Sequence, residues 1–130
     1  MALNYSRQRE AIKTCLMGRK DHPTADMVYM SIKQEYPNIS LGTVYRNLQL
    51  LTDLGQIQKI KVGDGIDHYD GDVSPHYHFY CTKCHSVLDL EMDRVDMIND
   101  IASRNFDGQI QGHILCFTGL CGECAKAELS

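Results

Sequence analysis

The sequence predicts an α+β protein in which three helices and a β-hairpin precede a second, smaller unit of strands and a helix. Apolar residues recur every three or four positions in three successive stretches, which is typical of amphipathic helices. Two short strand-like runs follow around the Gly-Asp-Gly turn at 63–65, and such a turn is typical of a hairpin. Beyond residues 71–74 the pattern changes. We therefore expect two domains, residues 1–74 and 75–130.

The first domain has the element order of a winged helix-turn-helix. We expect its first helix over residues 4–20. Thr24 is a suitable N-cap for a second helix that runs to about residue 36, and Ser40 for a third that stops at Gly55. The expected core positions of the third helix are Leu41, Val44, Leu48 and Leu51. Its opposite face carries Thr43, Arg46 and Gln49.

The remaining elements are short. Residues 56–62 and 66–70 are the predicted strands of the hairpin, and residues 76–81, 86–92 and 112–119 are the predicted strands of the second domain. A helix over residues 92–105 is expected to turn Val95, Ile98 and Ile101 inward. So small an α/β domain needs a metal ion, a partner chain or both to be stable.

Composition limits the classes of function. No apolar run is long enough to span a bilayer, and the N-terminus lacks the apolar stretch of a signal peptide. We therefore expect a cytoplasmic protein, in which six Cys are metal ligands or core residues rather than disulfides. The net charge is -4, with the acidic surplus in residues 75–130. Only local patterns could therefore indicate nucleic-acid binding.

The Cys-Thr-Lys-Cys-His stretch at 81–85 has two interpretations. Cys-x-x-Cys-His is the attachment spacing of a c-type haem, whereas Cys-x-x-Cys is half of a structural zinc site. A second pair follows at Cys121 and Cys124, which the haem interpretation leaves unexplained. Two such pairs complete a closed tetrahedral shell with no open position for catalysis. We predict structural zinc on Cys81, Cys84, Cys121 and Cys124; Cys15 and Cys116 are expected to be buried core residues.

A second group of possible ligands consists of histidines and carboxylates. His76 and His78 are two residues apart on a predicted strand, so their side chains leave the same face. Asp70 ends the hairpin, Asp89 lies on the next strand, and His22 comes from the first domain. This set of ligands suits ferrous iron or manganese. Taken singly, His22, His68, His85 and His113 are more simply explained as surface or capping residues.

In combination, five segments resemble the ferric uptake regulator (Fur) family of metal-dependent repressors over essentially the whole chain. They are HPTAD at 22–26, SLGTVYRNLQLL at 40–51, HYD at 68–70, PHYHFYCTKC at 75–84 and GLCGEC at 119–124. The resemblance implies a homodimer that binds palindromic operator DNA, with the second domain as the dimerisation domain. It places the third helix in the major groove and the hairpin on the backbone or in the minor groove. The implied DNA-binding residues are Thr43, Tyr45, Arg46, Gln49, Lys59 and Lys61.

Within that family the chain looks most like the peroxide-sensing (PerR) branch. The regulatory ligands of that branch map onto His22, Asp70, His76, His78 and Asp89, and the iron-sensing branch usually has Glu in place of Asp70. The resemblance implies that hydrogen peroxide, acting on the ferrous form, oxidises His22 or His76 and releases the DNA. Two departures stand out. Pro75 and Tyr77 replace ligands of a further family site, leaving Asp96 and His113, and His85 stands where Gly is common.

Two other functions compete with a peroxide-sensing repressor. A Fur-type repressor could respond to iron or zinc alone. A metalloenzyme or electron carrier could use the His and Asp residues, or a haem at residues 81–85. An enzyme also needs a substrate pocket with general acid and base groups, and the sequence offers no separate set, so we expect a regulator rather than an enzyme.

Overall fold

The structure of the protein, a computed structural model, describes the backbone of residues 2–129 and the side chains of residues 7–129. The chain divides into two compact units, Met1–Ser74 and Pro75–Ser130. Within residues 2–129, no helix combines the length and the apolar character needed to cross a membrane.

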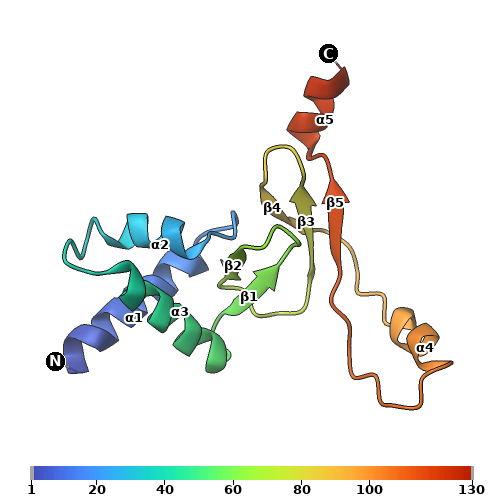
Figure 1. Ribbon diagram of the computed structural model, residues 1–130, viewed down its shortest axis with the longest axis horizontal. Helices are drawn as coiled ribbons and strands as arrows, with labels where there is room; N and C mark the ends of the chain where they lie inside the picture. Colours follow the sequence, from blue (N-terminus) through green and yellow to red (C-terminus); the bar gives the residue numbers. More distant parts are fainter. Residues whose placement is uncertain (1, 130) are drawn as a thin grey trace. The chain divides into compact units, whose positions relative to one another are not determined.

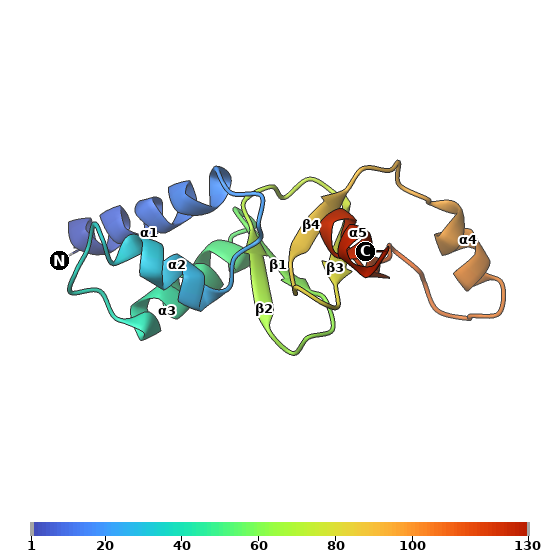
Figure 2. The same ribbon diagram turned by 90° about the horizontal axis from the view of Figure 1, so that it is seen from above.

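The first unit consists of three helices and an antiparallel hairpin (Figure 1). The helices are α1 (Ala2–Met17), α2 (Ala25–Ile32) and α3 (Leu41–Asp53), and the strands are β1 (Gln58–Lys61) and β2 (Asp67–Asp70). All three helices contact one another, and α1 and α2 also contact β2. The view from above shows α1 and α2 side by side (Figure 2). The hairpin pairs Gln58 with Asp70 and Lys61 with Asp67.

Both predicted N-caps are confirmed. The Thr24 hydroxyl accepts a hydrogen bond from the Met27 amide at 3.3 Å, and the Ser40 hydroxyl accepts one from the Thr43 amide at 3.1 Å. The predicted ends of the first two helices are wrong, because α1 stops at Met17 and α2 at Ile32. Tyr36 precedes Pro37, which disfavours helical backbone at Tyr36.

The hydrophobic core of the first unit gathers the inward faces of all three helices. The buried residues are Ile12, Leu16, Ala25, Val28, Ile32, Ile39, Val44, Leu48, Leu51, Ile57 and Tyr69. Three of the four positions predicted for the third helix are among them. Leu41 is 36 % exposed, since it is the first residue of α3 and the buried face begins one turn later at Val44.

Glycines shape both ends of the hairpin. Gly63 and Gly65 have φ angles of 90° and 78°, values that residues with a Cβ adopt rarely. After β2, the chain passes so close to α1 that a Cβ on Gly71 would lie 2.9 Å from the Cα of Met17. The hairpin turn and its return to the helices therefore both depend on glycine.

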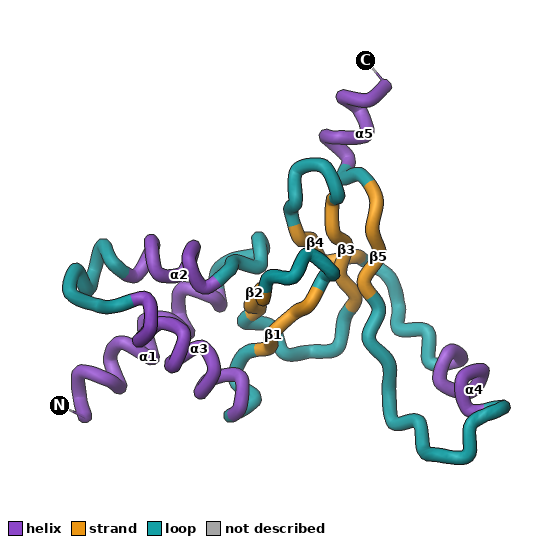
Figure 3. Tube along the Cα trace, viewed as in Figure 1, coloured by secondary structure: helices purple, strands orange, loops and turns teal. Residues whose placement is uncertain are grey.

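The second unit is built on a three-stranded sheet. Its strands are β3 (Tyr77–Cys81), β4 (Val87–Leu90) and β5 (Cys116–Gly119). The order is β4-β3-β5, antiparallel between β3 and β4 and parallel between β3 and β5. Helix α4 (Met97–Ser103) is flanked by extended loops (Figure 3), and α5 (Gly122–Leu129) follows β5. A mixed α+β fold with a winged helix-turn-helix is thus confirmed.

The predicted inward face of the helix over 92–105 is wrong for the single chain. Helix α4 is shorter and buries no residue; Val95 precedes it and is 36 % exposed, and Ile101 is 50 % exposed. Apart from Cys81, the buried apolar side chains described in this unit belong to three strand residues, Tyr77, Tyr80 and Val87. Among the residues described in this unit, α4 therefore has no buried face. Helix α5 was not predicted.

Candidate metal centres

The four cysteines of the two Cys-x-x-Cys pairs come together. Their sulfur atoms all lie within 4.8 Å of one another, and the Sγ atoms of Cys84 and Cys121 are 3.8 Å apart. Tetrahedral zinc with bonds of about 2.3 Å requires a sulfur separation of about 3.8 Å, so the cluster fits the ion. The parallel pairing of Cys81 with Gly119 on β5 brings the second pair, two residues further on, beside the first.

The thiols of this cluster differ in pKa. The backbone amides of Cys84 and Cys121 both donate to the Cys81 sulfur at 3.4 Å, and these bonds lower the pKa of Cys81 to about 5. The hydrogen bond with Cys121, together with burial and the neighbouring thiols, raises the pKa of Cys124 to about 12. Four thiolates so close together repel one another, and a bound divalent cation removes that penalty.

His22 and Asp70, in the first unit, form one part of the His/Asp ligand set. They are 1 % and 4 % exposed, and His22 Nδ1 lies 3.5 Å from Asp70 Oδ2. His22 lies in the loop between α1 and α2 with a φ of 50°, and Asp70 is the last residue of β2. A left-handed backbone at a non-glycine residue is strained, and such strain is commonest at functional sites.

The second unit holds the other part. Asp89 on β4 is the register partner of His78 on β3, and His76 lies just before β3. Asp89 Oδ1 lies 3.0 Å from His76 Nε2 and 3.5 Å from His78 Nε2. The two imidazole rings are 4.4 Å apart between centroids. Two imidazoles thus converge on one carboxylate, a donor set that suits ferrous iron or manganese as well as zinc.

Sequence reasoning missed the role of His68, which was expected on the surface or as a cap. The side chain is 8 % exposed, and its ring nitrogens lie 3.0 Å from the His22 carbonyl oxygen and 2.8 Å from Asp64 Oδ2. Burial raises the pKa of Asp64. The hydrogen bonds that its carboxylate accepts from His68 and from the Ile66 amide lower the pKa by more than burial raises it, so the net shift is downward. Strand alternation was the available signal, because it places His68 on the same side of β2 as Asp70.

In the described part of the chain, neither Asp96 nor His113 belongs to a cluster of three or more possible metal ligands. The Tyr77 hydroxyl lies 2.6 Å from His113 Nε2, and His113 Nδ1 lies 2.7 Å from Asn99 Oδ1. Tyr77 also accepts a hydrogen bond from the Val95 amide at 2.9 Å. These bonds tie β3 to the two loops around α4, a connection that no sequence motif indicated.

Two predictions about single residues need adjustment. Cys15 and Cys116, expected to be buried, are half-buried. Cys15 packs against the core of the first unit, whereas Cys116 lies in β5 at the edge of a sheet with little cover. His85, expected to be a surface or capping residue, is exposed and has a φ of 65°, and its Nδ1 lies 2.6 Å from the Tyr80 hydroxyl.

The sequence and the fold both match known proteins. A model of the ferric uptake regulator family matches residues 1–118. The chain is 38 % identical over 126 residues to the ferric uptake regulation protein of Bacillus subtilis, covering 93 % of this chain and 85 % of that protein. It is 33 % identical over 119 residues to the peroxide-responsive repressor PerR of Staphylococcus epidermidis, covering 92 % and 79 %.

The chain belongs to the ferric uptake regulator family.

Solved structures agree with this assignment. The Campylobacter jejuni peroxide stress regulator matches with a TM-score of 0.77 at 31 % identity, covering 94 % of this chain and 92 % of that one. The Helicobacter pylori Fur structure has a TM-score of 0.79 at 21 % identity, covering 92 % and 80 %, and supports the fold alone. As a member of the Fur family, the protein is a metal-responsive transcriptional repressor from a family of dimeric DNA-binding regulators.

The residues that the Fur resemblance assigns to DNA lie on an exposed, polar face of the first unit. Tyr45 is 48 % exposed, and Arg46 donates to the Thr43 hydroxyl at 3.0 Å one turn earlier on α3. Lys59 donates to Gln49 at 2.8 Å, which joins β1 to α3. In a winged helix-turn-helix, α3 is the recognition helix and the β1–β2 hairpin is the wing. The recognition helix and the wing therefore share one hydrogen-bonded surface.

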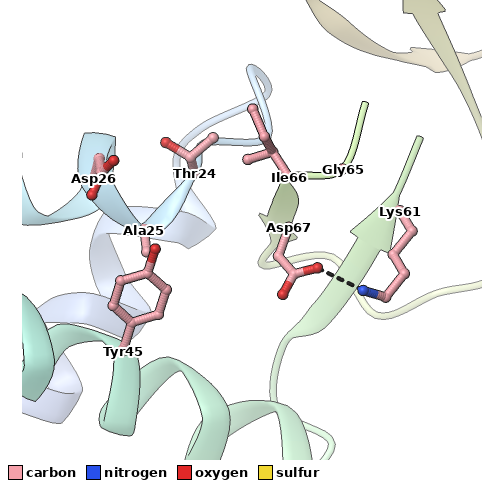
Figure 4. A pocket seen from close by; sticks show the side chains of 8 residues that line it. All are labelled: Thr24, Ala25, Asp26, Tyr45, Lys61, Gly65, Ile66 and Asp67. Carbon is pink, nitrogen blue, oxygen red and sulfur yellow. Dashed lines mark hydrogen bonds and ion pairs between the residues drawn. The ribbon is translucent and has the colours of Figure 1, made fainter. Parts of the chain in front are cut away.

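A pocket of about 530 Å³ opens beside this face, between the start of α2, Tyr45 and the wing (Figure 4). Asp67 lines it and lies 2.8 Å from the Lys61 ammonium. The hydrogen bond from Lys61 is the main cause of the lowered pKa of Asp67. Asp67 therefore offsets part of the positive charge that the wing presents.

Proposed function

We propose that the protein is a homodimeric, peroxide-responsive repressor that binds palindromic operator DNA through its first unit, residues 1–74. In this proposal zinc on Cys81, Cys84, Cys121 and Cys124 stabilises the dimerisation unit, residues 75–130. Ferrous iron or manganese binds His22, Asp70, His76, His78 and Asp89. Because these ligands come from both units, metal binding restricts the relative orientation of the two units and favours a form able to bind DNA.

The observation that carries the proposal is the convergence of His76 and His78 on Asp89, at 3.0 Å and 3.5 Å. These contacts keep oxidisable imidazoles at the metal with hard carboxylate ligands and no thiolate. Asp70 adds a second short carboxylate beside His22. The relatives that support peroxide sensing are the PerR proteins and the Campylobacter peroxide regulator.

The proposed DNA-binding residues lie on two elements, α3 and the wing. In this proposal Tyr45 and Arg46 on α3 contact bases and nearby phosphates. Thr43 accepts a hydrogen bond from Arg46, and Gln49 accepts one from Lys59, so both orient a neighbouring cation. Lys59 and Lys61 on the wing supply charge for the backbone or the minor groove. Since each lysine lies within 4.0 Å of Asp67, phosphates compete with this carboxylate for them.

To receive the signal, His22, Asp70, His76, His78 and Asp89 would hold ferrous iron, which would supply one electron to cleave the O–O bond of hydrogen peroxide and give hydroxide and a hydroxyl radical. In this proposal the radical adds to a ring carbon of His22 or His76, and the ferric ion takes up the second electron as that carbon loses its proton. The oxidised imidazole, which carries one added oxygen, is a poorer ligand. His22 is 1 % exposed, so an oxygen added to its ring also disturbs the packing of the loop that carries it. Loss of these ligands weakens metal binding and releases the DNA.

The test compares ferrous and manganese forms of the zinc-loaded protein. Each is prepared without oxygen, given one equivalent of hydrogen peroxide, and analysed by peptide mass spectrometry and by binding to a palindrome selected from random DNA with the manganese form. We expect one added oxygen on the His22 or His76 peptide, and loss of DNA binding, in the ferrous sample alone. His113, which bonds Tyr77, serves as the internal unmodified histidine.

An Asp70→Glu variant sharpens the comparison, because it retains the charge and adds one methylene to the ligand arm. The Fur resemblance places Glu in iron sensors, so less oxidation is expected in this variant at equal iron loading. Unmodified histidines in the ferrous wild type would reject peroxide sensing. Absence of salt-dependent binding to any palindrome would reject the repressor itself.

A second function, a repressor that responds to iron or zinc supply alone, has one observation in its favour. The Bacillus subtilis ferric uptake regulation protein is 38 % identical to the chain, above the 33 % of the Staphylococcus epidermidis PerR. Equal DNA affinity before and after peroxide treatment of the ferrous form would support it.

A further inference from the structure

His68 connects two parts of the first unit that have separate roles in the proposed function. Its ring lies within the unit, with both nitrogens in contact with oxygen atoms. Nδ1 lies 3.0 Å from the carbonyl oxygen of His22, and Nε2 lies 2.8 Å from the carboxylate of Asp64. A carbonyl oxygen only accepts, so Nδ1 is the donor in that bond.

The His22 side of this connection is a loop fastened to β2. Thr24 forms an antiparallel bridge with His68, and the Tyr69 amide donates to the Pro23 carbonyl at 2.9 Å. His22 itself has a φ of 50°, a conformation that persists only where its surroundings hold it. The bond from His68 to the His22 carbonyl acts at that strained residue and so fixes the direction of its imidazole.

The Asp64 side of the connection is the tip of the wing. Asp64 lies between Gly63 and Gly65, both with positive φ, and its Oδ1 accepts the Ile66 amide at 3.0 Å. The Asp64 side chain is 11 % exposed, although its turn is at the end of the hairpin. One carboxylate thus closes the wing turn and holds His68.

We infer that His68 is a positioning residue that couples the conformation of the wing tip to the metal ligand His22, through Asp64 on one side and the His22 carbonyl on the other. The inference rests on the proposed function, which makes His22 a ligand and the wing a DNA contact. A metal ion that orders His22 then orders the wing tip. By linkage, DNA that orders the wing tightens metal binding by the same factor.

Three variants separate this coupling from a merely structural role. His68→Phe fills the same space but breaks both bonds. Asp64→Ala frees the wing tip and leaves the bond from His68 to the His22 carbonyl. Asp67→Asn is the matched control, because Asp67 is a wing carboxylate of the same hairpin that pairs with Lys59 and Lys61 instead.

The measurement is hydrogen exchange on the millisecond-to-second scale, read by mass spectrometry on the zinc-loaded 130-residue chain with and without Mn²⁺. The Mn²⁺ affinity of each variant is measured alongside. In the wild type, Mn²⁺ should slow exchange in residues 20–24 and in residues 62–68. His68→Phe should weaken Mn²⁺ binding about tenfold, as loss of a supporting contact to a ligand does, and abolish the effect on the wing. Asp64→Ala should keep Mn²⁺ affinity within about threefold, yet lose the effect on the wing. Asp67→Asn should keep both.

Different outcomes reject different statements. If Mn²⁺ protects residues 20–24 and 76–78 of the wild type but leaves the wing unchanged, or if Asp64→Ala keeps wing protection, the coupling is rejected while the metal site stands. If Mn²⁺ changes no peptide, the proposed function is rejected. The coupling through His68 is then tested in protein that contains zinc alone. There His68→Phe must speed exchange in residues 20–24 and in residues 62–68, and Asp67→Asn must speed it in neither segment.

Discussion

At the scale of single residues, His85 shows how a strained backbone is offset locally. His85 directly follows Cys84, the second cysteine of the first Cys-x-x-Cys pair, and has a φ of 65°. A left-handed conformation costs a residue with a Cβ about 1–2 kcal/mol. Its Nδ1 lies 2.6 Å from the Tyr80 hydroxyl. That hydrogen bond contributes about 1 kcal/mol, which balances much of the strain.

This balance predicts the order of two substitutions. His85→Ala removes the bond and keeps the strain, whereas His85→Gly removes both, so the alanine variant should be less stable than the glycine variant by about 1 kcal/mol. Urea unfolding in excess zinc, followed by amide signals of residues 75–90, measures the difference. Tyr80→Phe is the control, since it should destabilise the wild type but change the glycine variant little. Equal stability of the alanine and glycine variants would contradict the account.

At the scale of elements, α3 depends on its first turn. The Ser40 hydroxyl accepts the Thr43 amide at 3.1 Å and also lies 2.9 Å from the Thr43 hydroxyl, which in turn accepts from Arg46. One hydrogen-bonded group at the start of the recognition helix therefore contains the N-cap Ser40, Thr43 and Arg46, and Arg46 is a predicted DNA contact.

Removal of this cap should weaken the whole first unit. Ser40→Ala leaves a helix amide without its acceptor and should lower the free energy of unfolding by about 1 kcal/mol. Ser40→Asp, which retains an acceptor at the same place, should stay close to the wild type. Urea unfolding followed by far-UV circular dichroism tests both. If the alanine and aspartate variants lose stability equally, Ser40 does not act as a cap.

Sequence patterns predicted elements best where the cause is local. Thr24 and Ser40 begin helices because their hydroxyls bond amides three residues on, and a glycine-rich turn makes a hairpin wherever strands flank it. The burial of α4 was harder to predict, because Val95, Ile98 and Ile101 repeat like a core face, whereas α4 has no buried residue in the described part of the chain.

The candidate metal centres were also predicted best where the cause is local. The two Cys pairs and the His76/His78 pair are evident from spacing, since short spacing fixes which side chains can converge. The contacts of His68 with Asp64 and with the His22 carbonyl, and of Tyr77 with His113, join residues 4 to 46 positions apart. Such contacts depend on strand register and loop path, which composition and periodicity do not encode.

At the scale of the whole molecule, the two units are stabilised in different ways. The first unit buries eleven residues in one core, drawn from all three helices, β2 and the loops. In the second, the buried apolar side chains described are few and belong to strands beside the cysteine cluster. A structural zinc site contributes on the order of 10 kcal/mol to the folding of a small domain. The second unit should therefore depend on zinc, and the first should not.

Zinc removal should accordingly unfold one unit and leave the other. When a strong chelator is added, or when Cys121→Ser removes one ligand, amides of residues 77–90 and 116–119 should lose protection from hydrogen exchange. Amides of α1, α2 and α3 should keep theirs, because their core contains no residue beyond Tyr69. Cys116→Ser is the matched control: its side chain is on β5 but outside the four-sulfur cluster, so zinc content and protection should stay unchanged. Joint loss of protection in both units would mean that the first unit draws its stability from the second, and the independence inferred from the separate cores would be wrong.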